Sequence, residues 1–324
     1  MVDYKGSVIA NPDGAAWGFA CKIHDYLMSK NSMDFDLCKI DTSSSDYNFR
    51  DGEFKPKILK NIRKGDCFFI HDSNLEPSRW FTELCLVNHA LKNSSAHEII
   101  DVLPYLKFAR QDQKDESRVP IGAKVVADVI GLYANRVMVL DVHNPAIQGF
   151  YNIPFDGLDS HPTLGAHLKK NHSEILENLV VMSPDEGGVK RARKCADRLD
   201  IKDIAMGDKY RKCAGKVGGS LGILGDVNGK NVLMVDDIID SGGTLISAAN
   251  ACRENGAKTV FAYCPHGLFT RGIENVSKSF DKLFIGDTIN VQGNSSLEVV
   301  SSVPLFAEAI YRVSVGESLS ELFD

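Results

Sequence analysis

Val235–Thr244 reads VDDIIDSGGT, and this stretch indicates the fold class of the chain. It follows the apolar run Leu233–Val235, which predicts a buried strand. It precedes Leu245–Asn255, whose sequence LISAANACREN predicts a helix that ends at Gly256. A buried strand that passes through a polar loop into a helix is the repeating unit of a parallel sheet, so this stretch predicts an α/β protein.

The same strand-then-polar pattern recurs along the chain. Short apolar runs end abruptly in polar residues near positions 68, 99 and 138, and again near 180, 232, 260 and 283. We therefore expect two similar α/β domains, each a mostly parallel sheet flanked by helices, with a junction near Ser160. The expected boundaries are 1–160 and 161–305, followed by a C-terminal helix and tail over 306–324 that packs back on the first domain.

The composition narrows the classes of function. The 324 residues are 44% hydrophobic and 25% charged, which is typical of an ordinary globular protein and leaves enough apolar material for two cores. A net charge of −6 disfavours a nucleic-acid partner, and no apolar run reaches the ~20 residues of a membrane span. The eight cysteines form no C-x-x-C pair, so we expect reduced thiols in a cytoplasmic protein.

The quoted loop has the chemistry of a site for a phosphorylated sugar. Gly242 and Gly243 allow a close backbone approach, and the N-terminus of the following helix favours an anion. Asp236 and Asp237 can accept hydrogen bonds from the hydroxyls of a sugar, directly or through Mg²⁺. The alternative is an ordinary capped helix, with Asp240 as its N-cap.

A second pair of candidate metal ligands follows the apolar run at position 138. Asp141 and His143 stand two residues apart at the end of a predicted strand, so their side chains point to the same side and can share a cation. Taken alone, a D-x-H sequence is more often a satisfied surface pair.

Longer motifs connect these sites to a known family. Val235–Thr244 resembles the phosphoribosyl diphosphate motif of the phosphoribosyltransferases and the ribose-phosphate diphosphokinases. Tyr105–Ala127, YLKFARQDQKDESRVPIGAKVVA, and Val139–Asp156, VLDVHNPAIQGFYNIPFD, resemble signatures of the diphosphokinases. The resemblance implies two phosphoribosyltransferase-like domains and transfer of the diphosphoryl group of Mg-ATP to ribose 5-phosphate, which yields phosphoribosyl diphosphate and AMP.

The resemblance also assigns roles to individual residues. On the nucleotide side it implies ATP contacts by Arg110, Gln111 and Asp115, adenine contacts by Phe49, Asp51 and Glu53 of an F-x-D-G-E-like hairpin, and Mg²⁺ ligation by Asp141 and His143. On the ribose side it implies contacts by Asp185 of SPDEGG, which lies near the metal, by Asp236 and Asp237, and by Asp240, Ser241, Gly242, Gly243 and Thr244. The catalytic side chains it implies are His143 and, in the Gly- and Lys-rich loop Lys209–Gly222, the pair Lys209 and Arg211.

Single residues among these have simpler explanations. Phe49 alone would belong to a core, Lys209 and Arg211 alone would be a solvated charge run, and the landmark His266 would be a buried, hydrogen-bonded histidine. The order and spacing of the motifs together favour the functional interpretation.

The sequence also departs from the family pattern. Asn152 stands where an aspartate is common, Asn144-Pro145 follows D-x-H in place of small residues, and Glu186 replaces a small residue in SPDEGG. Pro77–Trp80 replaces the usual Asn-Asp pair, which puts control by phosphate and ADP in doubt.

Three other functions compete with the diphosphokinase. A catalytically silent synthetase-associated subunit is disfavoured by the retained motifs, and a phosphoribosyltransferase would need no ATP segment. A phosphoribosyl diphosphate-binding regulator would bring a DNA-binding module. The resemblance implies a homo-oligomer, by family a hexamer built from dimers, in which the hairpin serves a neighbouring subunit.

Overall fold

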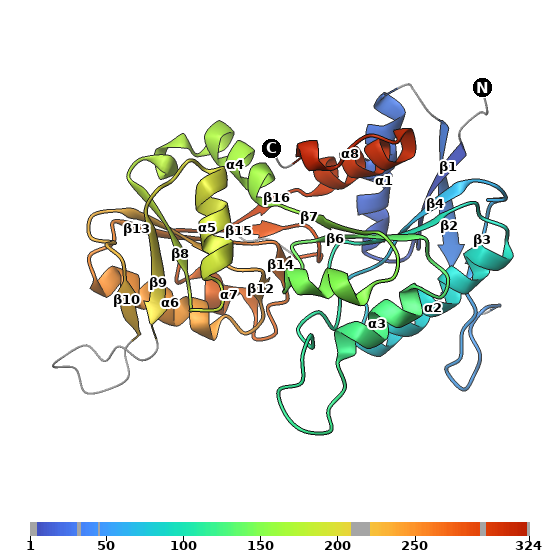
Figure 1. Cartoon of the computed structure of the whole chain (residues 1–324), viewed down its shortest axis with the longest axis horizontal. Coiled ribbons are helices and arrows are strands. Elements are labelled where there is room, and N and C mark those ends of the chain that lie inside the picture. Colours follow the sequence, from blue (N-terminus) through green and yellow to red (C-terminus); the bar gives the residue numbers. More distant parts are fainter. Residues whose placement is uncertain (1–4, 31–33, 45, 209–220, 292–295, 323–324) are drawn as a thin grey trace. The chain divides into compact units, whose positions relative to one another are not determined.

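The computed structural model describes residues 5–30, 34–44, 46–208, 221–291 and 296–322. The chain forms two compact units, shown in Figure 1. The N-terminal unit contains Met1–Asp159 together with Val303–Asp324, and the C-terminal unit contains Ser160–Ser302.

A seven-stranded sheet forms the centre of the N-terminal unit. Its strand order is β3-β2-β1-β4-β5-β6-β7, and β3 is its antiparallel strand. The strands are β1 (Lys5–Ala10), β2 (Asp34–Asp41), β3 (Lys57–Ile58), β4 (Asp66–Ile70), β5 (Ile99–Leu103), β6 (Arg136–Leu140) and β7 (Phe155–Leu158). All five residues of β5 are buried, because helices cover both faces of the sheet.

Each face of this sheet packs against its own helices (Figure 1). One face carries α2 (Pro77–Asn93), α3 (Gly122–Ile130) and the 3₁₀ helix η1 (Pro145–Phe150). The other carries α1 (Ala16–Ser29) and α8 (Val303–Val315), and the short η3 (Ser320–Leu322) follows α8. The rings of Phe19 on α1 and Phe306 on α8 lie 5.7 Å apart, so the last long helix of the chain completes the first core.

The C-terminal unit repeats this plan with the strand order β10-β9-β8-β11-β13-β15-β16, in which β10 is antiparallel. Its main strands are β8 (Leu179–Ser183), β9 (Ile204–Asp208), β10 (Gly222–Leu224), β11 (Asn231–Val235), β13 (Thr259–Cys264), β15 (Lys282–Gly286) and β16 (Leu297–Val300). A small two-stranded sheet joins β12 (Ile238–Ile239) to β14 (His266–Gly267). One face packs against α6 (Gly243–Glu254) and α7 (Ile273–Ser277), and the other against α4 (His161–Asn171), η2 (Ser173–Leu176) and α5 (Val189–Arg198).

The two sheets therefore share one topology, and the predicted α/β class with two mostly parallel sheets is confirmed. In each unit the strand order reverses between the first and fourth strands in sequence, which are β1 and β4 in one sheet and β8 and β11 in the other. Open parallel sheets bind ligands at the carboxyl ends of the strands at such a reversal.

The helix predicted after the quoted loop is also present. In α6, Leu245, Ala248, Ala249 and Cys252 are buried at helical spacing against the sheet, and Gly256 adopts the left-handed conformation (φ +84°) just beyond the helix. Among the described residues, no helix is both long and apolar enough to cross a membrane.

Candidate active site

Two loops meet at the strand reversal of the C-terminal unit. Asp185 follows β8, and Asp236 and Asp237 follow β11, its parallel neighbour. The hydroxyl of Ser183 donates a hydrogen bond to the backbone oxygen of Asp185 at 2.5 Å, and the Gly188 N–H donates to Oδ1 of Asp185 at 3.3 Å. A Cβ on Gly188 would lie 2.6 Å from Oγ of Ser183, so this tight turn requires glycine.

Arg191, on the helix that follows the Asp185 loop, bonds both aspartates of the other loop. Its Nη1 lies 2.9 Å from Oδ1 of Asp236, and its Nη2 lies 2.9 Å from Oδ1 of Asp237. Burial raises the pKa of Asp236, and the neighbouring charge of Asp237 raises it further, whereas Arg191 opposes the shift. Two carboxylates held this close are stabilised by a cation, and Arg191 supplies part of that charge.

The helix that follows these aspartates begins with open backbone donors. Gly242 is the N-cap of α6 in the left-handed conformation (φ +78°), and as a glycine it has no side chain that could accept hydrogen bonds from the first N–H groups of the helix. Gly243 and Thr244 are exposed at this end. A Cβ on Gly242 would lie 2.4 Å from Cγ2 of Val276, so both space and backbone conformation require glycine. Uncapped N–H groups at a helix N-terminus form an anion site.

Asp240 does not cap this helix, so the interpretation of the stretch as an ordinary helix with an Asp240 N-cap is wrong. Oδ1 of Asp240 accepts a hydrogen bond from the Thr270 hydroxyl at 2.6 Å, and its backbone oxygen accepts one from the Thr270 N–H at 3.1 Å. Asp240 thus anchors the loop, while Ser241, its neighbour, remains partly exposed.

The corresponding helix of the N-terminal unit differs at this point. It is α2, which follows β4 as α6 follows β11, and its N-cap is Glu76. The Glu76 carboxylate accepts hydrogen bonds from the N–H groups of Ser78 at 3.2 Å and Arg79 at 3.3 Å. At α2, the Glu76 carboxylate therefore occupies the anion site at the helix N-terminus. At α6, whose N-cap is a glycine, the same site is open to a phosphate.

The N-terminal unit instead carries polar segments after β5 and β6. Nδ2 of Asn144 donates a hydrogen bond to Oδ2 of Asp112 at 2.7 Å, and this contact ties the segment with Arg110, Gln111 and Asp115 to the segment with Asp141 and His143. The predicted side chains Arg110, Gln111, Asp115 and His143 are exposed, and Asp141 is half-buried with a left-handed backbone (φ +39°). These side chains are accessible to a ligand at one edge of the sheet.

The predicted hairpin is present around Phe49. Asn48 pairs with Phe54 in an antiparallel bridge, the Phe49 N–H donates to the Glu53 oxygen at 2.7 Å, and the Glu53 N–H donates to Oδ1 of Asp51 at 3.1 Å. Phe49 is 53% exposed, so its assignment to a core is wrong. An exposed ring beside two carboxylates is suited to stacking on a flat heterocycle.

Other landmarks have structural roles or lie outside the described residues. His266 is buried, and its Nδ1 lies 2.9 Å from Oγ1 of Thr288, as the simpler interpretation of this histidine predicted. Asp287 accepts hydrogen bonds from Ser301 and Ser302. Lys209 and Arg211 lie outside the described residues.

The structure also locates residues that depart from the family pattern. Besides contacting Asp112, Asn144 accepts a hydrogen bond from the Ala146 N–H at 3.0 Å and caps η1. Asn152 and Glu186 are exposed.

Arg191 is the residue of this site that the sequence analysis did not single out. A signal was available, because Arg191 stands three residues after Gly188 at the start of α5 and so faces the loop that precedes the helix. Its salt bridges to Asp236 and Asp237 could be recognised only once β8 and β11 were known to be neighbours.

Comparison with known proteins places these features in context. A family profile described as the N-terminal domain of ribose phosphate pyrophosphokinase matches residues 19–132, and one described as the phosphoribosyl synthetase-associated domain matches residues 202–324. The ribose-phosphate pyrophosphokinase of Chlorobaculum tepidum is 43% identical over 282 residues, which cover 86% of each chain. The one of Bacillus subtilis is 42% identical over 281 residues, 85% of this chain and 87% of its own.

The fold has a match among solved structures. The crystal structure of phosphoribosylpyrophosphate synthetase from Mycobacterium smegmatis superposes with a TM-score of 0.84 at 29% sequence identity. The match covers 97% of this chain and 99% of that one, so the likeness includes both units.

Proposed function

Because this chain belongs to the ribose-phosphate pyrophosphokinase family, we propose that it transfers the diphosphoryl group of Mg-ATP to the anomeric hydroxyl of ribose 5-phosphate. The products are phosphoribosyl diphosphate and AMP. The observation that carries this proposal is the N-terminus of α6, where the N-cap Gly242 has no side chain to occupy the anion site. The loop before this helix carries two carboxylates, and Arg191 bonds both of them. Phosphate and vicinal hydroxyls match these two groups of partners.

On the ribose side, the backbone N–H groups of Gly243 and Thr244 bind the 5-phosphate, and the hydroxyls of Ser241 and Thr244 add donors. Asp236 and Asp237 accept hydrogen bonds from the ribose hydroxyls, and Arg191 holds both carboxylates in place and opposes the raised pKa of Asp236. Asp240 positions the loop through Thr270. Asp185 lies on the neighbouring loop and is available to the ribose and its metal.

On the nucleotide side, Arg110, Gln111 and Asp115 bind ATP. Phe49 stacks on adenine, and Asp51 and Glu53 contact the edge of the base from a neighbouring subunit, as the family resemblance implies. The exposure of Phe49 supports this role, because burying such a ring only in the complex contributes free energy to binding rather than to folding.

The donor sets fit Mg²⁺. Carboxylates are the hard oxygen ligands that Mg²⁺ prefers, and a nearby cation would lower the pKa of Asp236, which burial and then the charge of Asp237 raise. Asp141 and His143 would hold the ion on the nucleotide side, and Asp185 would hold it on the ribose side. The ion supplies charge neutralisation on the phosphates.

In the transfer itself, the anomeric oxygen forms a bond to the β-phosphorus of ATP and loses its proton. The bond from that phosphorus to the oxygen bridging to the α-phosphate breaks, and AMP leaves with the bonding electrons. Little covalent chemistry falls to the protein, so positioning and charge stabilisation dominate. By resemblance, Lys209 and Arg211 stabilise the charge that develops on the transferred group.

The assembly and the compartment follow from the same proposal. A hairpin that serves a neighbouring active site requires an oligomer, for which we propose a homohexamer. The seven cysteines in the described part of the chain are free thiols, which supports a reducing, cytoplasmic location.

The test is a single incubation of the protein with Mg-ATP and ribose 5-phosphate, followed by separation of the nucleotides. We expect AMP and phosphoribosyl diphosphate in equal amounts. ADP in place of AMP would indicate a simple kinase, and absence of turnover would favour the silent associated subunit. Either result would overturn the proposal.

A further inference from the structure

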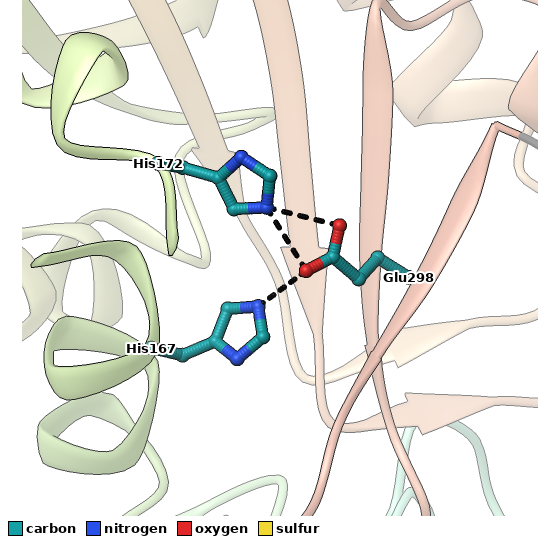
Figure 2. Close-up of side chains that lie close together, drawn as sticks. All are labelled: His167, His172 and Glu298. Carbon is teal, nitrogen blue, oxygen red and sulfur yellow. Dashed lines mark hydrogen bonds and ion pairs between the residues drawn. The ribbon is translucent and has the colours of Figure 1, made fainter. Parts of the chain in front are cut away.

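A cluster of two histidines and a glutamate lies outside the proposed active site. His167 is on α4, His172 directly follows this helix, and Glu298 is on β16 (Figure 2). Nε2 of His167 lies 2.6 Å from Oε1 of Glu298, and Nε2 of His172 lies 2.9 Å from the same oxygen. All three side chains are largely buried, with exposed fractions between 15% and 28%. Figure 2 shows both Nε2 atoms pointing toward the carboxylate.

The cluster lies at the opposite edge of the sheet from the ribose loop. Glu298 is the second residue of β16, and Lys282 is the first residue of the parallel strand β15. Asp236, by contrast, follows the carboxyl end of β11 in the same sheet. The proposed reaction therefore makes no use of these histidines.

A polar side chain lies near the second ring nitrogen of each histidine. Nδ1 of His172 lies 3.6 Å from Oε1 of Glu174. Nδ1 of His167 lies 3.3 Å from the side-chain amide of Asn171, and a half-turn of that amide presents its oxygen. The proton between each Nε2 and the carboxylate must leave when a cation binds, and a shift of the ring proton to Nδ1, where these groups can accept it, frees the Nε2 lone pair. This is how outer partners orient histidines that bind metals.

Glu298 is held as an anion in the same manner. Nζ of Lys282 lies 2.8 Å from Oε2 of Glu298, and Nε2 of His172 lies 2.9 Å from each of the two carboxylate oxygens. With neutral imidazoles, the charges of Glu298, Glu174 and Lys282 sum to −1, which favours a cation.

An aromatic ring fixes the two imidazoles. Phe284, which is fully buried, lies 6.0 Å from the ring centre of His167 and 5.3 Å from that of His172, in edge-to-face contacts. The ligands are therefore oriented before any ion arrives.

We propose that Nε2 of His167, Nε2 of His172 and Oε1 of Glu298 bind a divalent transition ion of the Zn²⁺ type, which fastens the end of α4 to the edge strand β16. Two imidazoles and one carboxylate suit Zn²⁺ better than Mg²⁺, and water completes the tetrahedral set. Metal–ligand distances of about 2.0–2.2 Å place tetrahedral ligands roughly 3.3 Å apart. The contacts of 2.6 and 2.9 Å therefore need to open by roughly 0.4–0.7 Å.

The test compares Zn²⁺ binding by the full-length protein and two variants after removal of metals with EDTA. One variant carries both His167→Gln and His172→Gln. The control is His89→Gln, because His89 is an exposed histidine on α2 that also contacts an asparagine four residues later, Asn93. Equilibrium dialysis with metal analysis counts the ions per chain, and circular dichroism verifies folding.

We expect the wild type and His89→Gln to bind one more Zn²⁺ per chain than the double variant. Zn²⁺ should also raise the thermal unfolding temperature of the first two by several degrees more than that of the third. If the double variant does not fold, Glu298→Gln, which keeps the shape of the side chain, carries the same comparison. Equal Zn²⁺ counts in all proteins would overturn the proposal and leave the cluster as an ion-pair network held by protons.

Discussion

Nη1 of Arg191 lies 2.9 Å from Oδ1 of Asp236, so a residue at the start of α5 sets the charge of a residue at the end of β11. The second guanidinium nitrogen bonds Asp237 in the same way. Without this cation, the raised pKa of Asp236 would rise further, and protonation would remove an acceptor for the ribose hydroxyls.

Arg191→Ala should therefore raise the KM for ribose 5-phosphate at least ~10-fold, because the loss of a charge-assisted contact costs about 1.5–3 kcal/mol. The free energy of unfolding should also fall, by about 3 kcal/mol, because a largely buried acidic pair loses its partner. Steady-state kinetics and urea unfolding measure the two effects. Arg193→Ala, at an exposed position on the same helix, is the control, and equal effects of both variants would contradict this role of Arg191.

Gly242→Ala should abolish most use of ribose 5-phosphate, because the added Cβ would lie 2.4 Å from Cγ2 of Val276 in a left-handed backbone. The matched control is Gly229→Ala, which also has a positive φ (+68°) but no neighbouring atom within 4 Å of the new Cβ. The control should lose only about 1 kcal/mol of stability and keep its activity. We expect kcat/KM for ribose 5-phosphate to fall at least ~100-fold in Gly242→Ala alone. Such a decrease corresponds to a loss of about 2.7 kcal/mol in transition-state binding. Equal kcat/KM values for the two variants would exclude an anion site at α6.

Phe49→Ala should weaken ATP use without weakening the fold. Stacking of a base on an aromatic ring contributes about 1–3 kcal/mol, so the KM for ATP should rise roughly 5- to 150-fold. The ring is 53% exposed, so the unfolding temperature should hardly change. Leu59→Ala, at a residue 48% exposed nearby in the sequence, should change neither quantity. An unchanged KM for ATP in Phe49→Ala would refute the stacking role.

Lys209→Ala should lower turnover far more than ATP affinity, because the proposed role of this cation is confined to charge that develops during transfer. Measurement of kcat beside the dissociation constant for ATP separates the two effects. Lys212→Ala, a change of equal charge three residues along the sequence, is the comparison. Unchanged turnover in Lys209→Ala would remove this residue from the mechanism.

Asp101→Asn should stabilise the protein, and more so at higher pH. Asp101 is fully buried, and one of its oxygens has no hydrogen-bond partner among the described residues, whereas the other accepts from Asn88 at 2.7 Å. Burial raises the pKa of Asp101 to about 7, although the Asn88 hydrogen bond opposes the shift. The folded state therefore holds a proton that the unfolded state releases near pH ~4.

The free energy of unfolding that Asp101 removes therefore grows as the pH rises from about 4 to about 7. Above about pH 7 this destabilisation stays constant. At about pH 4 the wild type and Asp101→Asn should differ little in free energy of unfolding. At pH 8 the variant should be more stable by on the order of 2–4 kcal/mol. Urea titrations at the two pH values measure this difference, and an equal gap at both would show that Asp101 does not titrate in this range.

Much of the site could be predicted from the sequence because its signals are local. The hairpin at Phe49 follows from Asp51 and Gly52, and the open turn before α6 follows from Gly242 and Gly243, because each conformation depends on neighbours a few residues away. The same applies to the alternation of buried strands and helices, which predicts a parallel sheet wherever it occurs.

Contacts between distant segments could not be predicted in this way. Arg191 reaches Asp236 across 45 positions, and His167 reaches Glu298 across 131. The α8 helix completes the core over α1 through contacts such as Tyr26 to Glu308, 282 positions apart. No local pattern encodes these pairs, because only the strand order of each sheet decides which loops and helices become neighbours.

By itself, then, the sequence determined the two α/β sheets, the glycine turn before α6 and the hairpin at Phe49. The tertiary structure alone decided how the two topologically equal sheets differ. In the N-terminal unit Glu76 caps α2, whereas the N-terminus of α6 in the C-terminal unit has no side-chain cap among the described residues. A helix N-terminus can satisfy its free N–H groups with a carboxylate of the protein or with a phosphate from outside, and the fold leaves the second option at α6.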